Sequence, residues 1–362
     1  MAAVKKLLLS LCYTVLILIV VAVGFFFVSP GQANFYLGSF YLTRGNEARA
    51  ASFFNKSCAN DHLQSCANLG HFYQSARGVE RDYIQASKLL QKACDGGYTA
   101  SCNGLGNMYS AGRGVNKDQA KAVELYKISC DGGYVSGCSN LGNSYRQGEG
   151  VDQDYSRAFE LLNQSCGQES TYACYHLADL YLKGNGVAQD KVKAVQIYNQ
   201  QCDSNDIYSC NVLGHLYENG NDVEKDLIKA AKYYTTSCNK NLAESCRRLG
   251  YMYAEGKGID TNFAQAKIYF EKACNYNDAN SCSYLGHMYR EGLGVEKSHY
   301  QAKLYFDQAC KDNNMYACSA MGNMHEFGYG AKLDKAKAAQ FYEKACKGGE
   351  KEGCDGLSRV KS

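Results

Sequence analysis

The sequence predicts an all-α fold, an α/α solenoid of stacked helix-turn-helix repeats with one disulfide in each repeat. The main observation is a pair of cysteines eight residues apart that recurs every 36 residues, nine times in the chain. A fixed spacing of leucine, glycine and tyrosine follows most of these pairs. A repeat of this length cannot bury a core alone and becomes stable by stacking on its neighbours.

The paired cysteines predict disulfides, because cysteines that occur in pairs are typical of proteins from an oxidising compartment. A zinc site is the alternative, but zinc usually takes cysteines with two to four residues between them, in sets of four. No histidine recurs beside the pairs here. We therefore expect no metal and no cofactor. The expected disulfides are Cys58–Cys66, Cys94–Cys102, Cys130–Cys138, Cys166–Cys174, Cys202–Cys210, Cys238–Cys246, Cys274–Cys282, Cys310–Cys318 and Cys346–Cys354.

The first helix of each repeat carries the second cysteine of a pair. After Cys102, the residues Leu105, Gly106 and Tyr109 follow at i+3, i+4 and i+7, which places them on one face of a helix. The residue after the leucine is glycine in most repeats and Ala178 in one. This small residue is expected to let a second helix approach closely.

The second helix of each repeat follows a glycine-containing turn. Gly112 and Gly114 are expected to end the first helix, because glycine readily adopts the left-handed conformation at helix C-termini. Asp118 is then expected to begin the second helix, either as its N-cap or as an acidic residue in its first turn. The first cysteine of the next pair ends that helix, so each disulfide is expected to join neighbouring repeats. The buried face of the second helix is expected to consist of Ala122, Leu125 and Tyr126.

The two ends of the array differ from the regular repeats. Residues 34–57 follow the same frame, but their turn is four residues shorter and they lack the cysteine pair, so we interpret them as a degenerate capping repeat. Eight 36-residue repeats occupy residues 58–345. Residues 346–362 contain only a first helix, and we interpret them as a C-terminal capping half-repeat.

The N-terminal segment predicts export. Lys5 and Lys6 precede an uncharged stretch, 7–28, which is long enough to cross a bilayer. A small-residue site that ends at Ala33 is also compatible with cleavage. Residues 1–33 are therefore either a membrane-spanning signal anchor or a cleaved signal peptide. Both alternatives place the repeats in the periplasm or outside the cell.

The charge balance argues against nucleic acid as a partner. The net charge is +3, from 39 basic and 36 acidic residues that are spread through all of the repeats. A nucleic-acid-binding domain would show a basic stripe and a higher pI.

The repeat frame resembles a known family. Leu105-Gly106, Tyr109, the Gly112-x-Gly114 turn and the following helix resemble the Sel1-like repeat, a relative of the tetratricopeptide repeat. With the cysteine pairs and the export segment, the chain is similar to the exported cysteine-rich Sel1-repeat proteins of Helicobacter and related bacteria. The resemblance covers residue 34 to the C-terminus and implies a solenoid with a disulfide in each repeat.

The same resemblance implies a slow penicillin-binding or β-lactamase activity, and hence a β-lactam or peptidoglycan-derived ligand. Serine β-lactamases need Ser-x-x-Lys, Ser-Asp-Asn and Lys-Thr-Gly. Ser237-x-x-Lys240 occurs here, whereas the other two motifs are absent. A Ser-x-x-Lys is expected by chance in a chain of this length. We therefore assign no catalytic residue, and an enzyme is the second hypothesis.

A polar position repeated on the first helices is the best candidate for a binding site. It lies on the side of the helix away from the buried leucine and tyrosine, which is the concave side in solenoids of this kind. An ordinary solvated helix face is the alternative interpretation. The residues at this position are Asn107, Asn143, Asp179, His215, Tyr251, His287 and Asn323, with Arg247 in a neighbouring position.

Three functions follow from these observations. The first is a disulfide-stabilised scaffold that binds a protein or peptide on this face. The second is the β-lactam-hydrolysing protein, which depends on the family resemblance alone. The third is a thiol-redox or metal-handling role, which would need reactive cysteines in place of paired ones.

Overall fold

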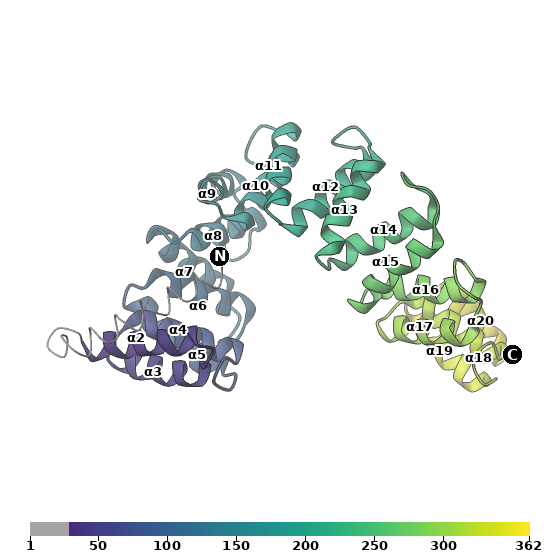
Figure 1. Ribbon diagram of the computed structural model, residues 1–362, viewed down its shortest axis with the longest axis horizontal. Coiled ribbons are helices and arrows are strands. Elements are labelled where there is room, and N and C mark those ends of the chain that lie inside the picture. Colours follow the sequence, from purple (N-terminus) through teal and green to yellow (C-terminus); the bar gives the residue numbers. More distant parts are fainter. Residues whose placement is uncertain (1–28) are drawn as a thin grey trace. The chain divides into compact units, whose positions relative to one another are not determined.

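The computed structural model describes residues 29–362 (Figure 1). Within this range all regular secondary structure is helical, in nineteen helices, as the sequence predicted. Most of the expected export segment lies outside the described residues. In the part that is described, no helix is long and apolar enough to cross a membrane.

The chain divides into two compact units, Met1–Gln189 and Asp190–Ser362, and each is described by itself. In the N-terminal unit, first and second helices alternate. They are α2 (Pro30–Thr43), α3 (Glu47–Ala59), α4 (Leu63–Ser75), α5 (Tyr83–Asp95), α6 (Thr99–Ala111), α7 (Gln119–Asp131), α8 (Val135–Gln147), α9 (Tyr155–Gly167) and α10 (Thr171–Lys183). Helix α2 begins four residues before the start expected for the degenerate first repeat.

The C-terminal unit continues the alternation. Its helices are α11 (Lys191–Asp203), α12 (Ile207–Asn219), α13 (Leu227–Asn239), α14 (Ala243–Glu255), α15 (Phe263–Asn275), α16 (Ala279–Glu291), α17 (His299–Lys311), α18 (Met315–Phe327), α19 (Lys335–Lys347) and α20 (Lys351–Lys361). In both units each helix packs on the helices next to it in the sequence, the arrangement of a solenoid.

The helix boundaries follow the predicted capping residues. Helix α6 ends at Gly112, which has the left-handed φ of 66°. Helix α7 begins after Asp118, whose side chain accepts a hydrogen bond from the Lys121 N–H at 2.9 Å. The second glycine of the turn, Gly114, also has a positive φ, and a Cβ there would collide with the backbone carbonyl of Tyr83 in α5. The Gly-x-Gly turn therefore both ends a helix and packs tightly on the preceding repeat.

The core of each repeat forms where its two helices approach closely. Ala122, Leu125 and Tyr126 of α7 are buried, as predicted. A Cβ on Gly106 of α6 would lie only 2.6 Å from the Tyr126 ring. The small residue after the leucine therefore allows the close approach of the two helices that the sequence predicted.

All nine predicted disulfides are present. Cys94 lies at the end of α5 and Cys102 in α6, with their Cα atoms 4.8 Å apart. The turn between them contains Gly97, with a φ of 94°. Each disulfide therefore joins the second helix of one repeat to the first helix of the next. Among the described residues, no group of three or more His, Cys, Asp or Glu side chains is arranged to hold a metal ion.

Candidate functional site

The predicted binding residues all lie on the first helices of the repeats. The helices concerned are α6, α8 and α10 in the N-terminal unit and α12, α14, α16 and α18 in the C-terminal unit. All of them except Arg247 occupy the same place in their helices, because the 36-residue period is strict; Arg247 lies four residues before Tyr251 on α14. The structure adds what the pattern alone could not supply, namely the neighbours of each side chain.

In the N-terminal unit these side chains form hydrogen bonds and ion pairs within their own repeats. The Asn107 Oδ1 accepts a hydrogen bond from the Tyr126 hydroxyl at 2.8 Å. Asn143 accepts one from the Arg146 guanidinium at 2.8 Å. Asp179 forms an ion pair with Lys183 at 2.8 Å. The polar atoms of these three residues are therefore already partly used in hydrogen bonds and an ion pair within the protein.

In the C-terminal unit two of the predicted residues join successive first helices. The His215 ring lies 3.1 Å from the Glu244 carboxylate, which is on α14. Arg247 on α14 donates to Asp278, the N-cap of α16, at 3.1 Å, and its side chain is only 20% exposed. These contacts stabilise the stacking of repeats, so Arg247 is held in place before any ligand binds.

Two further predicted residues, Tyr251 and His287, line a cavity of about 320 Å³ on the first-helix face of the C-terminal unit. Helices α14, α16 and α18 contribute to it. Its lining consists of Tyr251, Asn280, Ser283, Tyr284, His287, Asn314 and Tyr316. Asn323 lies on α18 but does not line the cavity, and it accepts a hydrogen bond from the Tyr342 hydroxyl at 2.7 Å.

The aromatic rings of the cavity form a packed cluster. The ring centroid of Tyr284 lies 5.4 Å from that of Tyr251 and 4.4 Å from that of Phe270, which is completely buried. Burial raises the pKa of the Tyr251 and Tyr284 phenols, so both remain protonated at neutral pH. These side chains can therefore contact an apolar group and still donate hydrogen bonds.

Polar side chains at the cavity rim are held in fixed positions. The Asn314 amide donates to the Asn280 Oδ1 at 2.9 Å. The amide N–H groups of Asn280 have no partner among the described residues and are available as donors. The Arg290 guanidinium lies 3.0 Å from the His287 ring and 3.2 Å from the Tyr316 hydroxyl. Burial, and then the Arg290 charge, lowers the pKa of His287. This ring is therefore neutral at pH 7. Because a guanidinium can only donate, the ring accepts from Arg290 at Nδ1, and its Nε2–H can donate one hydrogen bond.

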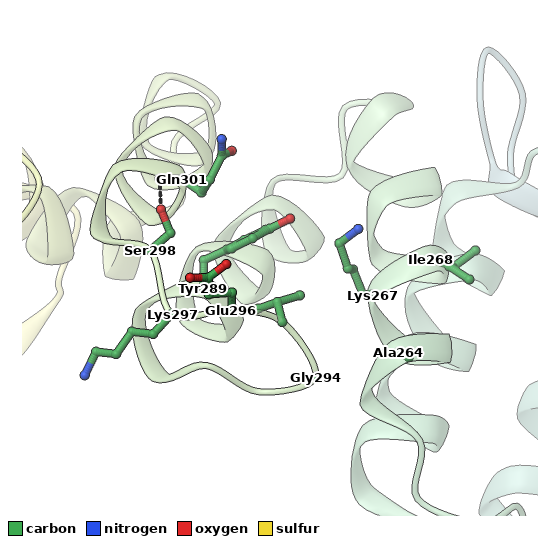
Figure 2. A pocket seen from close by; sticks show the side chains of 10 residues that line it. Ala264, Lys267, Ile268, Tyr289, Gly294, Glu296, Lys297, Ser298 and Gln301 are labelled. Carbon is green, nitrogen blue, oxygen red and sulfur yellow. Dashed lines mark hydrogen bonds between the residues drawn. The ribbon is translucent and has the colours of Figure 1, made fainter.

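A second cavity, of about 710 Å³, lies on the side of the second helices (Figure 2). It is bounded by α15, Tyr289 of α16, the turn 294–298 and the start of α17. Lys267 and Tyr289 project toward one another across it, as Figure 2 shows. Lys267 is already paired with Glu271 at 2.9 Å. None of the residues that the sequence predicted as binding residues lines this cavity.

The Ser-x-x-Lys sequence that begins at Ser237 does not form an accessible site. Ser237 is completely buried near the end of α13. Its hydroxyl donates to backbone carbonyl oxygens, at 3.0 Å to Ile207 and at 3.3 Å to Tyr233. Ser237 precedes Cys238 as Ser129 precedes Cys130, and both are buried core positions of the repeat.

Besides Tyr251 and His287, the lining residue Ser283 occupies the repeat position of Arg247. Sequence reasoning missed the other four residues of the 320 Å³ cavity, Asn280, Tyr284, Asn314 and Tyr316. A signal for Tyr284 was present, because the same position in other repeats varies among Asn140, His176, Arg248 and Ala320. A position whose side chain changes from repeat to repeat is not fixed by packing and is a candidate for ligand recognition.

The family model for the Sel1 repeat matches nine segments of the chain. The matched residues are 31–62, 63–98, 99–134, 135–170, 171–206, 207–242, 243–277, 279–314 and 316–350. Among the curated proteins, no sequence matches the chain.

Solved structures of Sel1-repeat proteins are similar to this chain. A Sel1 repeat protein from Oxalobacter formigenes has a TM-score of 0.62 at 20% identity, over 85% of this chain and 89% of that one. A protective antigen from uropathogenic Escherichia coli strains has a TM-score of 0.55 at 22% identity, over 91% of this chain and 80% of that one. Cysteine rich protein B of Helicobacter pylori is 36% identical over 37% of this chain and 96% of that one, with a TM-score of 0.30.

Proposed function

Because the chain belongs to the Sel1 repeat family, we propose that it is a disulfide-stabilised scaffold that binds an extended segment of a protein partner on its first-helix face. The first helices present this face repeatedly, and in solenoids of this type the concave side is the extended binding surface. The partner segment crosses several repeats, and each repeat contacts a different part of it.

The observation that carries this proposal is the 320 Å³ cavity lined by three tyrosines, two asparagines, a serine and a histidine. An extended peptide presents backbone N–H and C=O groups at regular intervals, together with side chains of every kind. The Asn280 amide can donate to a backbone carbonyl oxygen of such a peptide. The Tyr251 and Tyr284 rings can contact one of its apolar side chains. Tyrosine is also frequent at the centres of protein interfaces.

The nine disulfides support action in an oxidising compartment outside the cytoplasm. We propose that residues 1–33 export the repeats there, either as a signal anchor or as a cleaved signal peptide. In both cases the binding face is exposed to envelope or extracellular proteins.

The test is selection of peptides from a random library displayed on phage, followed by measurement of affinity by fluorescence polarisation. The informative variant is Asn280→Asp, because the carboxylate still accepts from Asn314 but can no longer donate to a peptide carbonyl. The variant loses one hydrogen bond to the peptide and places a new charge beside it. We expect the free energy of binding to become less favourable by about 1.4 kcal/mol, which corresponds to about tenfold weaker binding.

The matched control is Asn116→Asp, which adds the same charge at an exposed residue in the turn between α6 and α7. It should leave the affinity unchanged. Selected peptides that bind Asn280→Asp and Asn116→Asp as tightly as the unmodified protein would place the peptide elsewhere and overturn the proposal.

A further inference from the structure

The C-terminal unit carries an apolar surface that departs from the pattern of the chain's own repeats. The position of Leu304 is occupied in other second helices by Lys88, Glu124, Glu160, Gln196, Lys232 and Gln340, and only Ile268 is also apolar. The position of Leu333 is polar in every other repeat, as Arg81, Lys117, Gln153, Gln189, Lys225, Thr261 and Lys297. Packing of the repeat therefore does not require apolar residues at these positions.

The apolar side chains at these positions point into solvent. Leu304 is 45% exposed, Leu333 is 61% exposed and Tyr300, one turn before Leu304 on α17, is 62% exposed. The turn between α18 and α19 packs on the first turn of α17, because the Tyr329 ring stacks on His299 with centroids 5.5 Å apart. Tyr329, itself about half exposed, is thereby placed beside the start of α17 with Tyr300.

Three lysines accompany these apolar side chains: Lys297 lines the 710 Å³ cavity together with Ile268, and Lys332 and Lys337 lie one residue before and four residues after Leu333 in the sequence. Lys297 precedes α17, Lys332 lies in the turn before α19 and Lys337 lies in the first turn of α19; all three are exposed. None of the three forms an ion pair with another of the residues that the structure describes. In the other repeats the position of Lys332 is mostly acidic, as Glu80, Asp152, Glu224, Asp260 and Glu296. The neighbouring Asp334 uses its carboxylate to cap α19, accepting from the Lys337 N–H at 2.9 Å.

We propose that this surface binds an anionic phospholipid bilayer. We call it the lysine-framed surface, and it consists of Ile268, Lys297, Tyr300, Leu304, Tyr329, Lys332, Leu333 and Lys337. Exposed aliphatic and tyrosine side chains enter the boundary between headgroups and acyl chains, and lysines around them contact lipid phosphates. The charge complementarity favours an anionic membrane over a second copy of the chain, since two copies would bring these lysines together.

The experiment uses the fact that the full chain contains no tryptophan. Leu304→Trp introduces a single tryptophan into the lysine-framed surface, and it can be excited at wavelengths that the tyrosines do not absorb. Its emission should shift to shorter wavelength with phosphatidylglycerol-containing vesicles, and brominated lipids should quench it. Pure phosphatidylcholine vesicles should have no effect, and high salt should reverse the shift because it screens the lysines.

The matched control is Glu124→Trp, at the same repeat position in α7, where the native side chain is 64% exposed. Both variants retain the N-terminal segment, so any attachment through that segment acts on both equally. Emission from position 124 should not respond to the vesicles. Tyr300→Trp provides a second reporter in case Leu304→Trp lacks the native circular dichroism spectrum.

The charge contribution is tested with Lys297→Gln, Lys332→Gln and Lys337→Gln together in the Leu304→Trp chain. Each lysine near an anionic surface contributes about fivefold to binding, so the triple change should weaken vesicle binding about 100-fold. Two outcomes would overturn the proposal. The first is tryptophan emission, from residue 304 and from residue 300, that does not change when anionic vesicles are added. The second is an emission shift that depends on protein concentration in the absence of lipid, which would indicate that a second copy of the chain covers the surface.

Discussion

Removal of one internal disulfide should destabilise the C-terminal unit by a predictable amount. The Cys274–Cys282 pair joins α15 to α16, and both cysteines are buried. A closed loop of this length contributes about 2.5 kcal/mol through the entropy of the unfolded chain. Replacing both residues by alanine also removes two buried sulfur atoms, for about 1.5 kcal/mol more. The expected loss in the free energy of unfolding is therefore about 4 kcal/mol.

The assay is urea unfolding followed by circular dichroism at 222 nm, with hydrogen exchange to locate the loss. Exchange should accelerate most in α15 and α16, because each repeat of a solenoid contacts only its neighbours. The matched control is Cys346→Ala with Cys354→Ala, which opens a loop of the same length between α19 and α20. That change should accelerate exchange in α20 and leave the main unfolding transition in place.

The double variant Cys274→Ala with Cys282→Ala should unfold at lower urea than the unmodified protein. Coinciding unfolding transitions would refute the reasoning. Titratable thiols at these positions in the native, unreduced protein would refute it equally, because the pair would then not be oxidised.

Three further predictions concern packing, pH and the last helix. Gly286→Ala should lower the free energy of unfolding in urea by about 1–3 kcal/mol, because the new Cβ would lie 2.7 Å from the Phe306 ring. The control is Gly167→Ala, where a Cβ meets nothing within 4 Å, and it should have no effect or stabilise the protein slightly. Burial, and then the Arg146 charge, lowers the pKa of His176 to about 4 from 6.5, so its contribution to stability is present above pH 6.5 and lost as the pH falls toward 4. The N-terminal unit should therefore unfold at lower urea at pH 5 than at pH 7, and His176→Gln should remove that difference. Arg359→Met should accelerate hydrogen exchange in α20, because Arg359 donates two hydrogen bonds of 2.7 Å to Glu326 of α18. Unchanged exchange would show that this ion pair does not stabilise the docking of α20.

The helices and disulfides could be predicted from sequence because the repeat presents the same signals many times. Asp118 as an N-cap and Gly112 as a helix end act through local backbone geometry, which a sequence pattern captures directly. The buried positions of α7 were predictable for the same reason, since periodicity alone determines which face of a helix is apolar.

The contacts of the polar residues could not be predicted in this way. The pattern placed Arg247 on an open helix face, but the structure pairs it with Asp278, 31 residues later and on the next first helix. Likewise, Tyr316 reaches Arg290 from α18 to α16. Such pairs depend on the distance between stacked repeats and on side-chain length, neither of which a periodic pattern contains.

The central claim is that a peptide binds on the first-helix face of the C-terminal unit. The most direct measurement replaces Tyr316 by the photo-crosslinking residue benzoylphenylalanine and irradiates the protein with a selected peptide. The reference is the same replacement at Tyr276, an exposed tyrosine in the turn after α15 and outside the cavity. The account predicts a covalent product at residue 316 and none at residue 276. A product at residue 276 without one at residue 316 would contradict it.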